Sequence, residues 1–208
     1  MTFTTIESFE SGNLDDYSGD KAIWDVVQDS NVAPDGQYYL RFDPPQFFFN
    51  DSSLYKPGVG GPGTTFRWWV DDQSDASYTM GPTFLMESLD SGYIIEPIFN
   101  NVRISILSPN NTLGENPLTN TSGPYYMEAE FSDTGNIVAR TYQSDQYSTV
   151  LDEVSVTDTT YSGDGFGFYG SSYATTSLSR AWDSFQIESA GGSGSPPTAP
   201  TNLTTTLL

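Results

Sequence analysis

The chain has no cysteine and no histidine among its 208 residues. Without cysteine it has neither disulfides nor thiolate ligands for a metal ion. Without histidine it lacks the commonest general base and the commonest transition-metal ligand. Catalysis by a Ser-His-Asp triad or by a Cys-His pair is therefore excluded.

Positive charge is also scarce. Lys21 and Lys56 are the only lysines, and 7 Lys and Arg residues face 27 Asp and Glu residues, which gives a formal net charge of -20. Nucleic acid is excluded as a partner, because phosphate contacts need Lys and Arg. The acids are interleaved with apolar residues such as Trp68 and Ile104 instead of forming one block, which indicates a folded domain with an acidic surface.

Such a surface repels itself at ordinary salt and weakens the compact state. At molar salt the Debye length falls to about 3 Å and the repulsion is screened. The shortage of lysine and the excess of acidic residues resemble the proteins of extreme halophiles. We therefore predict that the chain comes from a halophilic archaeon or its virus.

Long apolar runs are missing as well. No run approaches the roughly 18 residues of a membrane helix, so we expect no membrane insertion. The N-terminal stretch Met1–Ile6 has neither a basic region nor an apolar core, and we expect no signal peptide in this chain.

What the sequence does contain is typical of strands. Gly (19), Pro (13), Tyr (13) and Phe (13) are abundant, and short segments of alternating apolar residues lie between turn residues. No window of about 12 residues sustains a helical stripe. These patterns predict an all-β, two-sheet antiparallel sandwich or jelly roll. The alternating segments are 38–42, 66–70, 102–106, 125–131, 137–141, 154–156, 166–168 and 185–187.

The composition changes at Ala190. We predict a jelly-roll domain over 1–189, followed by a Gly/Ser/Pro linker and a C-terminal tail over 190–208. Pro200–Thr204 resembles the opening strand of a fibronectin type III module. The tail is expected either to be disordered or to dock on a neighbouring subunit.

Five stretches together resemble the concanavalin A-like, LamG-like jelly-roll domains and the related carbohydrate-binding modules, and the resemblance covers most of residues 1–189. They comprise an opening Phe-Glu-Ser-Gly segment, a glycine turn that leads into an alternating strand, two Gly-aromatic segments and a closing strand with an Asp. The stretches are Ser8–Asp20, Asp35–Phe42, Gly92–Ile95, Gly165–Tyr169 and Ala181–Ile187.

The resemblance implies a structural Ca²⁺, because in carbohydrate-binding jelly rolls the early Glu and the Asp of the final strand often share one. Residue by residue this points to Glu10 and Asp183, with Asp35 at the Asp-Gly turn as a third ligand. Hard oxygen ligands suit Ca²⁺. The alternative is that these are three ordinary members of an acidic surface.

Exposed aromatic side chains are candidates for sugar binding, because sugar rings stack on aromatic faces and Trp and Tyr add a polar group. Trp68 and Trp69 are adjacent on a strand and point to opposite faces, so one of them belongs to the core. Core packing is the alternative for most of the set. The carbohydrate-binding candidates are Trp68, Trp69, Tyr93, Tyr142 and Tyr169.

The segment Phe47-Phe48-Phe49 follows two prolines, which cannot donate ladder hydrogen bonds and so favour an edge or loop. Three consecutive aromatic residues on a strand cannot all face the interior. We predict that Phe47, Phe48 and Phe49 form a subunit interface of a homo-oligomer, cyclic in symmetry, in which this segment or the tail from Gly191 onward is covered by another copy.

We expect no enzyme. Glycoside hydrolysis needs two carboxylates at a defined separation, and Glu128 and Glu130 share a strand face. However, the Glu-x-Asp-x-x-Glu strand motif of the jelly-roll glucanases is absent, and neighbouring acids are common in a chain this acidic.

The sequence therefore favours a non-enzymatic structural or interaction module of a halophilic virus particle, such as a tail fibre, turret or capsid decoration. Its partners would be other copies, neighbouring virion proteins and a surface glycan of the host, and its location the virion or an extracellular surface. The alternative is a carbohydrate-binding module of a halophilic secreted or surface glycoside-active protein. A glucanase is the third hypothesis.

Overall fold

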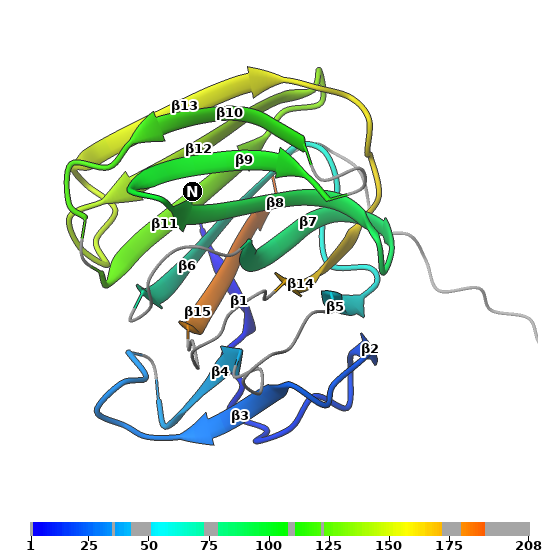
Figure 1. The fold of residues 1–208 in the computed structure, drawn as a ribbon, viewed down its shortest axis with the longest axis vertical. Coiled ribbons are helices and arrows are strands. Elements are labelled where there is room, and N and C mark those ends of the chain that lie inside the picture. The colour runs from blue at the N-terminus through cyan, green and yellow to red at the C-terminus, as the bar shows by residue number, and fades with distance from the viewer. Residues whose placement is uncertain are drawn as a thin grey trace, which may run out of the picture.

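The computed structural model describes residues 2–34, 36–42, 51–72, 79–107, 111–121, 123–171 and 180–189. Fifteen antiparallel strands in two sheets make up this part of the chain, which contains no helix. The prediction of an all-β sandwich is confirmed (Figure 1). Asp35, the Phe47–Phe49 segment and the tail over 190–208 lie outside the described residues.

The larger sheet has eight strands in the order β13-β12-β11-β6-β15-β4-β3, with β1 paired to β15. Its strands, in sheet order, are β13 (Val150–Thr157), β12 (Asn136–Tyr142), β11 (Tyr125–Phe131), β6 (Thr64–Asp72), β15 (Arg180–Ser189), β4 (Tyr38–Phe42), β3 (Trp24–Gln28) and β1 (Thr4–Glu7).

The smaller sheet has seven strands in the order β10-β9-β8-β7-β14-β5-β2. Its strands, in sheet order, are β10 (Asn111–Pro117), β9 (Asn101–Ile106), β8 (Ser91–Ile98), β7 (Met80–Ser88), β14 (Gly165–Ser171), β5 (Asp51–Lys56) and β2 (Ser18–Gly19). No described helix is long and apolar enough to cross a membrane.

The core lies between the sheets and is rich in aromatic rings. The ring of Phe66 from the larger sheet stacks on Phe166 of the smaller sheet, with centroids 6.3 Å apart, and Trp68 stacks on Phe185 at 6.1 Å. Strand alternation explains this arrangement, because Phe66, Trp68 and Val70 point inward while Arg67 and Trp69 point outward. The outer face of the larger sheet therefore presents a separate set of side chains, which includes Arg67 and Trp69.

Strand β15 contains a bulge in the middle of this outer face. Its register with β6 shifts between Asp183 and Gln186, and Ser184 has a φ of 60°. Bulges locally bend a strand and re-aim its side chains, and they are over-represented beside functional sites. The bulge lies opposite Trp68 and interrupts the regular pairing of β15 with β6 at that point.

Candidate functional site

Three aromatic side chains from adjacent strands form a row across the outer face of the larger sheet. Trp69 of β6 lies opposite Tyr126 of β11, and Tyr126 lies opposite Tyr142 of β12. Residues directly opposite on antiparallel strands have Cβ atoms about 5 Å apart and share a face. We call these three residues the aromatic row.

A second row, two positions along each strand, begins with the amide of Gln186 and continues with four alternating charges. Gln186, Arg67, Glu128, Arg140 and Glu153 are consecutive cross-strand partners from β15 to β13. The Arg67 Nη2 atom lies 2.8 Å from the Glu128 Oε2 atom, and Arg140 Nη1 lies 2.9 Å from Glu128 Oε1. Arg140 Nε donates to Glu153 Oε2 at 2.7 Å. We call these residues the charged row.

The loop between β12 and β13 folds back over both rows through Tyr147. Its ring lies 5.1 Å from the Tyr142 ring and 6.2 Å from the Tyr126 ring, both edge-on. The Arg67 guanidinium sits 4.3 Å from the centre of the Tyr147 ring, a cation–π distance. The Tyr147 hydroxyl donates to the Trp68 carbonyl at 3.2 Å, opposite the β15 bulge. Tyr147 therefore ties the loop to the sheet.

A pocket of about 330 Å³ opens between this loop and the bulge. Two of its lining residues, Tyr147 and Ser184, are among the six described non-glycine residues with positive φ, at 49° and 60°. Strained backbone of this kind costs about 1–3 kcal/mol per residue and clusters at functional sites. We call this cavity the aromatic pocket; it is lined by Pro34, Trp69, Tyr126, Asp145, Tyr147, Ser184 and Gln186.

The phenols around the pocket are held in their neutral form. Burial, and then the negative charge of Asp145, raise the pKa of Tyr126. Burial, together with the hydrogen bond that its hydroxyl donates to Glu128 at 2.8 Å, raises the pKa of Tyr142 to about 12. Burial also raises the pKa of Tyr147, although the Arg67 charge opposes it. These hydroxyls can therefore both donate and accept hydrogen bonds across the physiological pH range.

The guanidinium of Arg140 is fixed by three carboxylates. Burial lowers its pKa, but hydrogen bonds to Glu153, Glu130 and Glu128 outweigh burial and raise the pKa above its ordinary value. Glu128 is 5% exposed, and both its oxygens are occupied by Arg67, Arg140 and Tyr142. The predicted pair Glu128 and Glu130 does share this face, but Glu128 is engaged as the anchor of the charged row.

The five aromatic residues predicted to bind carbohydrate are distributed over different parts of the fold. Trp69 and Tyr142 belong to the aromatic row, and Trp69 lines the pocket. Trp68 and Tyr93 are core residues with no exposed surface, which corrects their assignment to a sugar platform, since stacking needs an accessible ring face. Tyr169 is 7% exposed and packs with Ile94 and Leu107, away from the aromatic pocket.

Four residues of the pocket were not predicted from the sequence: Tyr126, Tyr147, Asp145 and Gln186. The alternation of 125–131 does place Tyr126 on the face of Glu128 and Glu130, so its outward direction was accessible from the sequence. Its meeting with Trp69 depends on the register between β11 and β6, and the position of Tyr147 depends on a loop. Neither the register between two strands nor the position of a loop residue leaves a periodic signal in the sequence.

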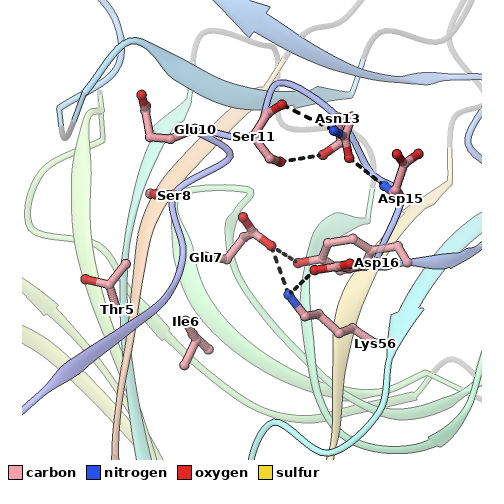
Figure 2. Close-up of a pocket in the computed structure, with 11 residues that line it drawn as sticks. Thr5, Ile6, Glu7, Ser8, Glu10, Ser11, Asn13, Asp15, Asp16 and Lys56 are labelled. Carbon is pink, nitrogen blue, oxygen red and sulfur yellow. Dashed lines mark hydrogen bonds and ion pairs between the residues drawn. The ribbon is translucent and has the colours of Figure 1, made fainter.

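A second, acidic pocket of about 500 Å³ lies beside β1 and the segment that follows it (Figure 2). Lys56 Nζ lies 3.4 Å from Glu7 Oε2 and 3.5 Å from Asp16 Oδ2. The Tyr17 hydroxyl donates to the same Glu7 oxygen at 3.1 Å. Glu10 also lines this pocket, but its side chain points away from the Lys56 cluster in Figure 2.

The residues predicted to bind calcium have well-defined partners. Glu10 Oε1 accepts the backbone N–H groups of Gln37 and Tyr38 at 2.8 and 2.9 Å. Asp183 is fully buried, and its Oδ1 atom accepts the backbone N–H of Ser184 at 2.6 Å. Among the described residues, no three acidic side chains form a group that could hold a metal ion. With Asp35 outside the described residues, the calcium site stays a prediction.

Neither a protein-family model nor a curated protein sequence matches the chain. Among solved structures, it is similar to the cellulose induced protein Cip1 (TM-score 0.63, 14% identity, covering 91% of this chain and 97% of that one). It is also similar to the carbohydrate binding module CBM66 from Bacillus subtilis (TM-score 0.59, 12% identity, covering 85% of this chain and 98% of that one). A third similar structure is the exoplasmic/lumenal domain of VIP36 in its Ca²⁺/Man3GlcNAc-bound form (TM-score 0.57, 11% identity, covering 85% of this chain and 88% of that one). At such identities the likeness is one of fold: this chain has the β-sandwich architecture found in carbohydrate-binding modules and lectin-like domains.

Proposed function

We propose that this chain is a non-enzymatic glycan-binding module and that the aromatic pocket is its sugar site. The observation that carries the proposal is the pocket itself, where three aromatic side chains meet polar groups and two of these residues, Tyr147 and Ser184, have strained backbone. Sugar sites combine ring faces with a few fixed polar groups that set orientation. Tyr126 and Tyr147, both half-buried, supply the ring faces, and Trp69, which is 5% exposed, adds lining surface. Asp145, Ser184 and Gln186 supply the polar groups.

The engagement of Glu128 supports a binding role over hydrolysis. A glycosidase needs one carboxyl group to donate a proton and another to act as base or nucleophile. Both oxygens of Glu128 already accept hydrogen bonds from two arginines and a tyrosine. The carboxylate that lines the aromatic pocket is that of Asp145.

The setting that we propose for this module is the surface of a halophilic virus particle, where several copies would present the pocket to a host glycan. The net charge of -20 supports a high-salt environment. The same pocket would serve a carbohydrate-binding module attached to a secreted enzyme, which is the alternative setting.

Tyr126 is the residue with which to test the site, because it is half-buried and its ring lines the pocket. The Y126A variant should bind a soluble neutral polysaccharide about tenfold more weakly than the wild type, equivalent to about 1.4 kcal/mol. Affinity electrophoresis in gels containing β-glucan, mannan or galactan measures this loss.

Two control variants make the result specific. Y126F keeps the ring and should retain most of the binding, while F99N changes an exposed ring at the β8–β9 turn, away from the pocket, and should bind normally. Thermal unfolding by circular dichroism verifies that each variant is folded. Wild-type protein that binds none of the polysaccharides, or folded Y126A that binds as well as wild type, contradicts the proposal.

A further inference from the structure

We infer that the aromatic pocket is selective for uncharged saccharides and rejects those that carry carboxylate or sulfate groups. This inference rests on the proposed function and adds to it the chemical class of the ligand. It follows from the charges that line the pocket, from the state of the arginines nearby and from the net charge of the chain.

The charged side chain that lines the pocket is a carboxylate. Asp145 is exposed on the β12–β13 loop, and the other lining side chains are aromatic, hydroxyl, amide or proline groups. A carboxylate accepts hydrogen bonds from sugar hydroxyls, whereas it repels a second carboxylate at contact distance. An uncharged sugar therefore gains an acceptor at Asp145, and an anionic sugar meets a like charge.

The arginines of this face have carboxylate partners in the described structure. Arg67 pairs with Glu128, and its guanidinium lies 4.0 Å from the ring centre of Phe3 and 4.3 Å from that of Tyr147. Arg140 contacts Glu128, Glu130 and Glu153. The positive charge of each arginine is therefore already balanced by a carboxylate of the same sheet, so an anionic sugar gains less from approaching it.

Arg41 on β4 follows the same pattern, because its Nη2 atom lies 3.1 Å from Asp25 Oδ2 on the neighbouring strand β3. A site for anionic glycans presents unneutralised Arg or Lys to the ligand, in the way that phosphate and carboxylate sites do. The outer face of the larger sheet instead uses its arginines to bind its own carboxylates.

The net charge of -20 repels any anion at low salt, wherever it binds, so the test must separate this field from the pocket. At about 1 M salt the Debye length is about 3 Å, and charges beyond the pocket are screened. A preference for uncharged over anionic saccharides that persists at 1 M KCl therefore arises from groups in contact with the ligand.

The test compares one neutral polysaccharide, chosen because the wild type binds it, with the same polymer after its primary hydroxyls are oxidised to carboxylates. In 1 M KCl the oxidised polymer should bind at least tenfold more weakly to the wild type. The D145N variant should reduce the ratio of the two affinities, neutral polymer over oxidised polymer, several-fold. The D90N variant, which removes the same charge from the exposed β7–β8 turn, should leave the ratio unchanged.

Three results overturn the inference while leaving the proposed function intact: equal or tighter binding of the oxidised polymer, a discrimination that disappears at 1 M KCl, or equal ratios for D145N and D90N. Failure to bind any neutral polysaccharide is a different result, because it overturns the proposed function itself. Titration calorimetry with soluble oligosaccharides of the same polymer provides the affinities.

Discussion

Glu128 shows how a single buried carboxylate organises the outer face of the larger sheet. A buried charge is costly unless it is paired and fully hydrogen-bonded. Arg67 binds one of its oxygens, while Arg140 and Tyr142 bind the other. The aromatic row and the charged row are thereby joined, because the Tyr142 hydroxyl reaches from one row to the other.

The burial of Tyr142, together with its hydrogen bond to Glu128, predicts a specific pH dependence of stability. The pKa of Tyr142 rises from 10.0 to about 12 in the folded chain, so between these values the folded state keeps a proton that the unfolded state releases. The free energy of unfolding must therefore fall as the pH rises through this window. Denaturant unfolding across the window should show a steeper fall for the wild type than for Y142F.

A matched control for this prediction is Y38F, which removes a half-buried tyrosine hydroxyl elsewhere on the larger sheet. It tests whether the loss of any phenol changes the slope. Identical slopes for the wild type and Y142F contradict the raised pKa of Tyr142 in the folded chain.

At the residue level, the burial of a side chain could be predicted from the sequence where strand alternation alone decides which face it points to. The adjacency of Trp68 and Trp69 predicts that one ring is buried, and Trp68 is in the core while Trp69 lines the pocket. Tyr93 could not be placed in this way, because the whole of β8 after Ser91 is buried and neither face of the strand presents the alternation of a half-exposed strand.

At the level of elements, the strands whose sequence alternates were predictable, whereas strand β7, which is covered on both faces and does not alternate, was not. The segment 125–131 coincides with β11, and 137–141 lies within β12. Strand β7 begins with seven consecutive buried residues from Met80 to Met86, so it carries no period-2 signal. The pocket depends on such non-periodic features, namely the register of β11 with β6, the β15 bulge and the Tyr147 loop.

Strand β14 is packed tightly within the smaller sheet, which predicts a large effect of adding a methyl group to it. A Cβ atom at Gly167 would collide with the Leu54 carbonyl of the adjacent strand β5. The G167A variant should therefore be destabilised by about 1–3 kcal/mol, as expected for overpacking. Urea unfolding measures the change.

The control for this prediction is G61A, because the nearest contact of a Cβ atom at Gly61 is the Gly163 carbonyl at 3.4 Å. G61A should change the free energy of unfolding by well under 1 kcal/mol, within about ±0.5 kcal/mol for a site without such a clash. Equal stabilities of G167A and G61A would show that the smaller sheet can shift to admit the methyl group.

At the level of the whole molecule, four of the five arginines lie beside one of two buried glutamates, Glu96 and Glu128. Arg103 lies 2.6 Å from Glu96 Oε1, and Arg180 Nη1 lies 3.9 Å from Glu96 Oε2. Burial raises the pKa of Glu96 even though both arginines oppose it. Arg180 belongs to the larger sheet and Glu96 to the smaller one, so this cluster joins the two sheets. Most surface acids are left without such compensation, since 27 acids face 7 cations.

This excess predicts a strong salt dependence of stability. The repulsion of a net charge of -20 weakens the compact state, and screening relieves it. Because the Debye length falls from about 10 Å at 0.1 M to about 3 Å at 1 M, most of the rise in the thermal midpoint should occur below about 1 M KCl. Sucrose stabilises proteins by exclusion and without screening charge, so it should give a smaller rise at the same molarity. A midpoint that stays flat in KCl, or that rises equally in sucrose, would show that the surface charge does not limit the stability of this fold.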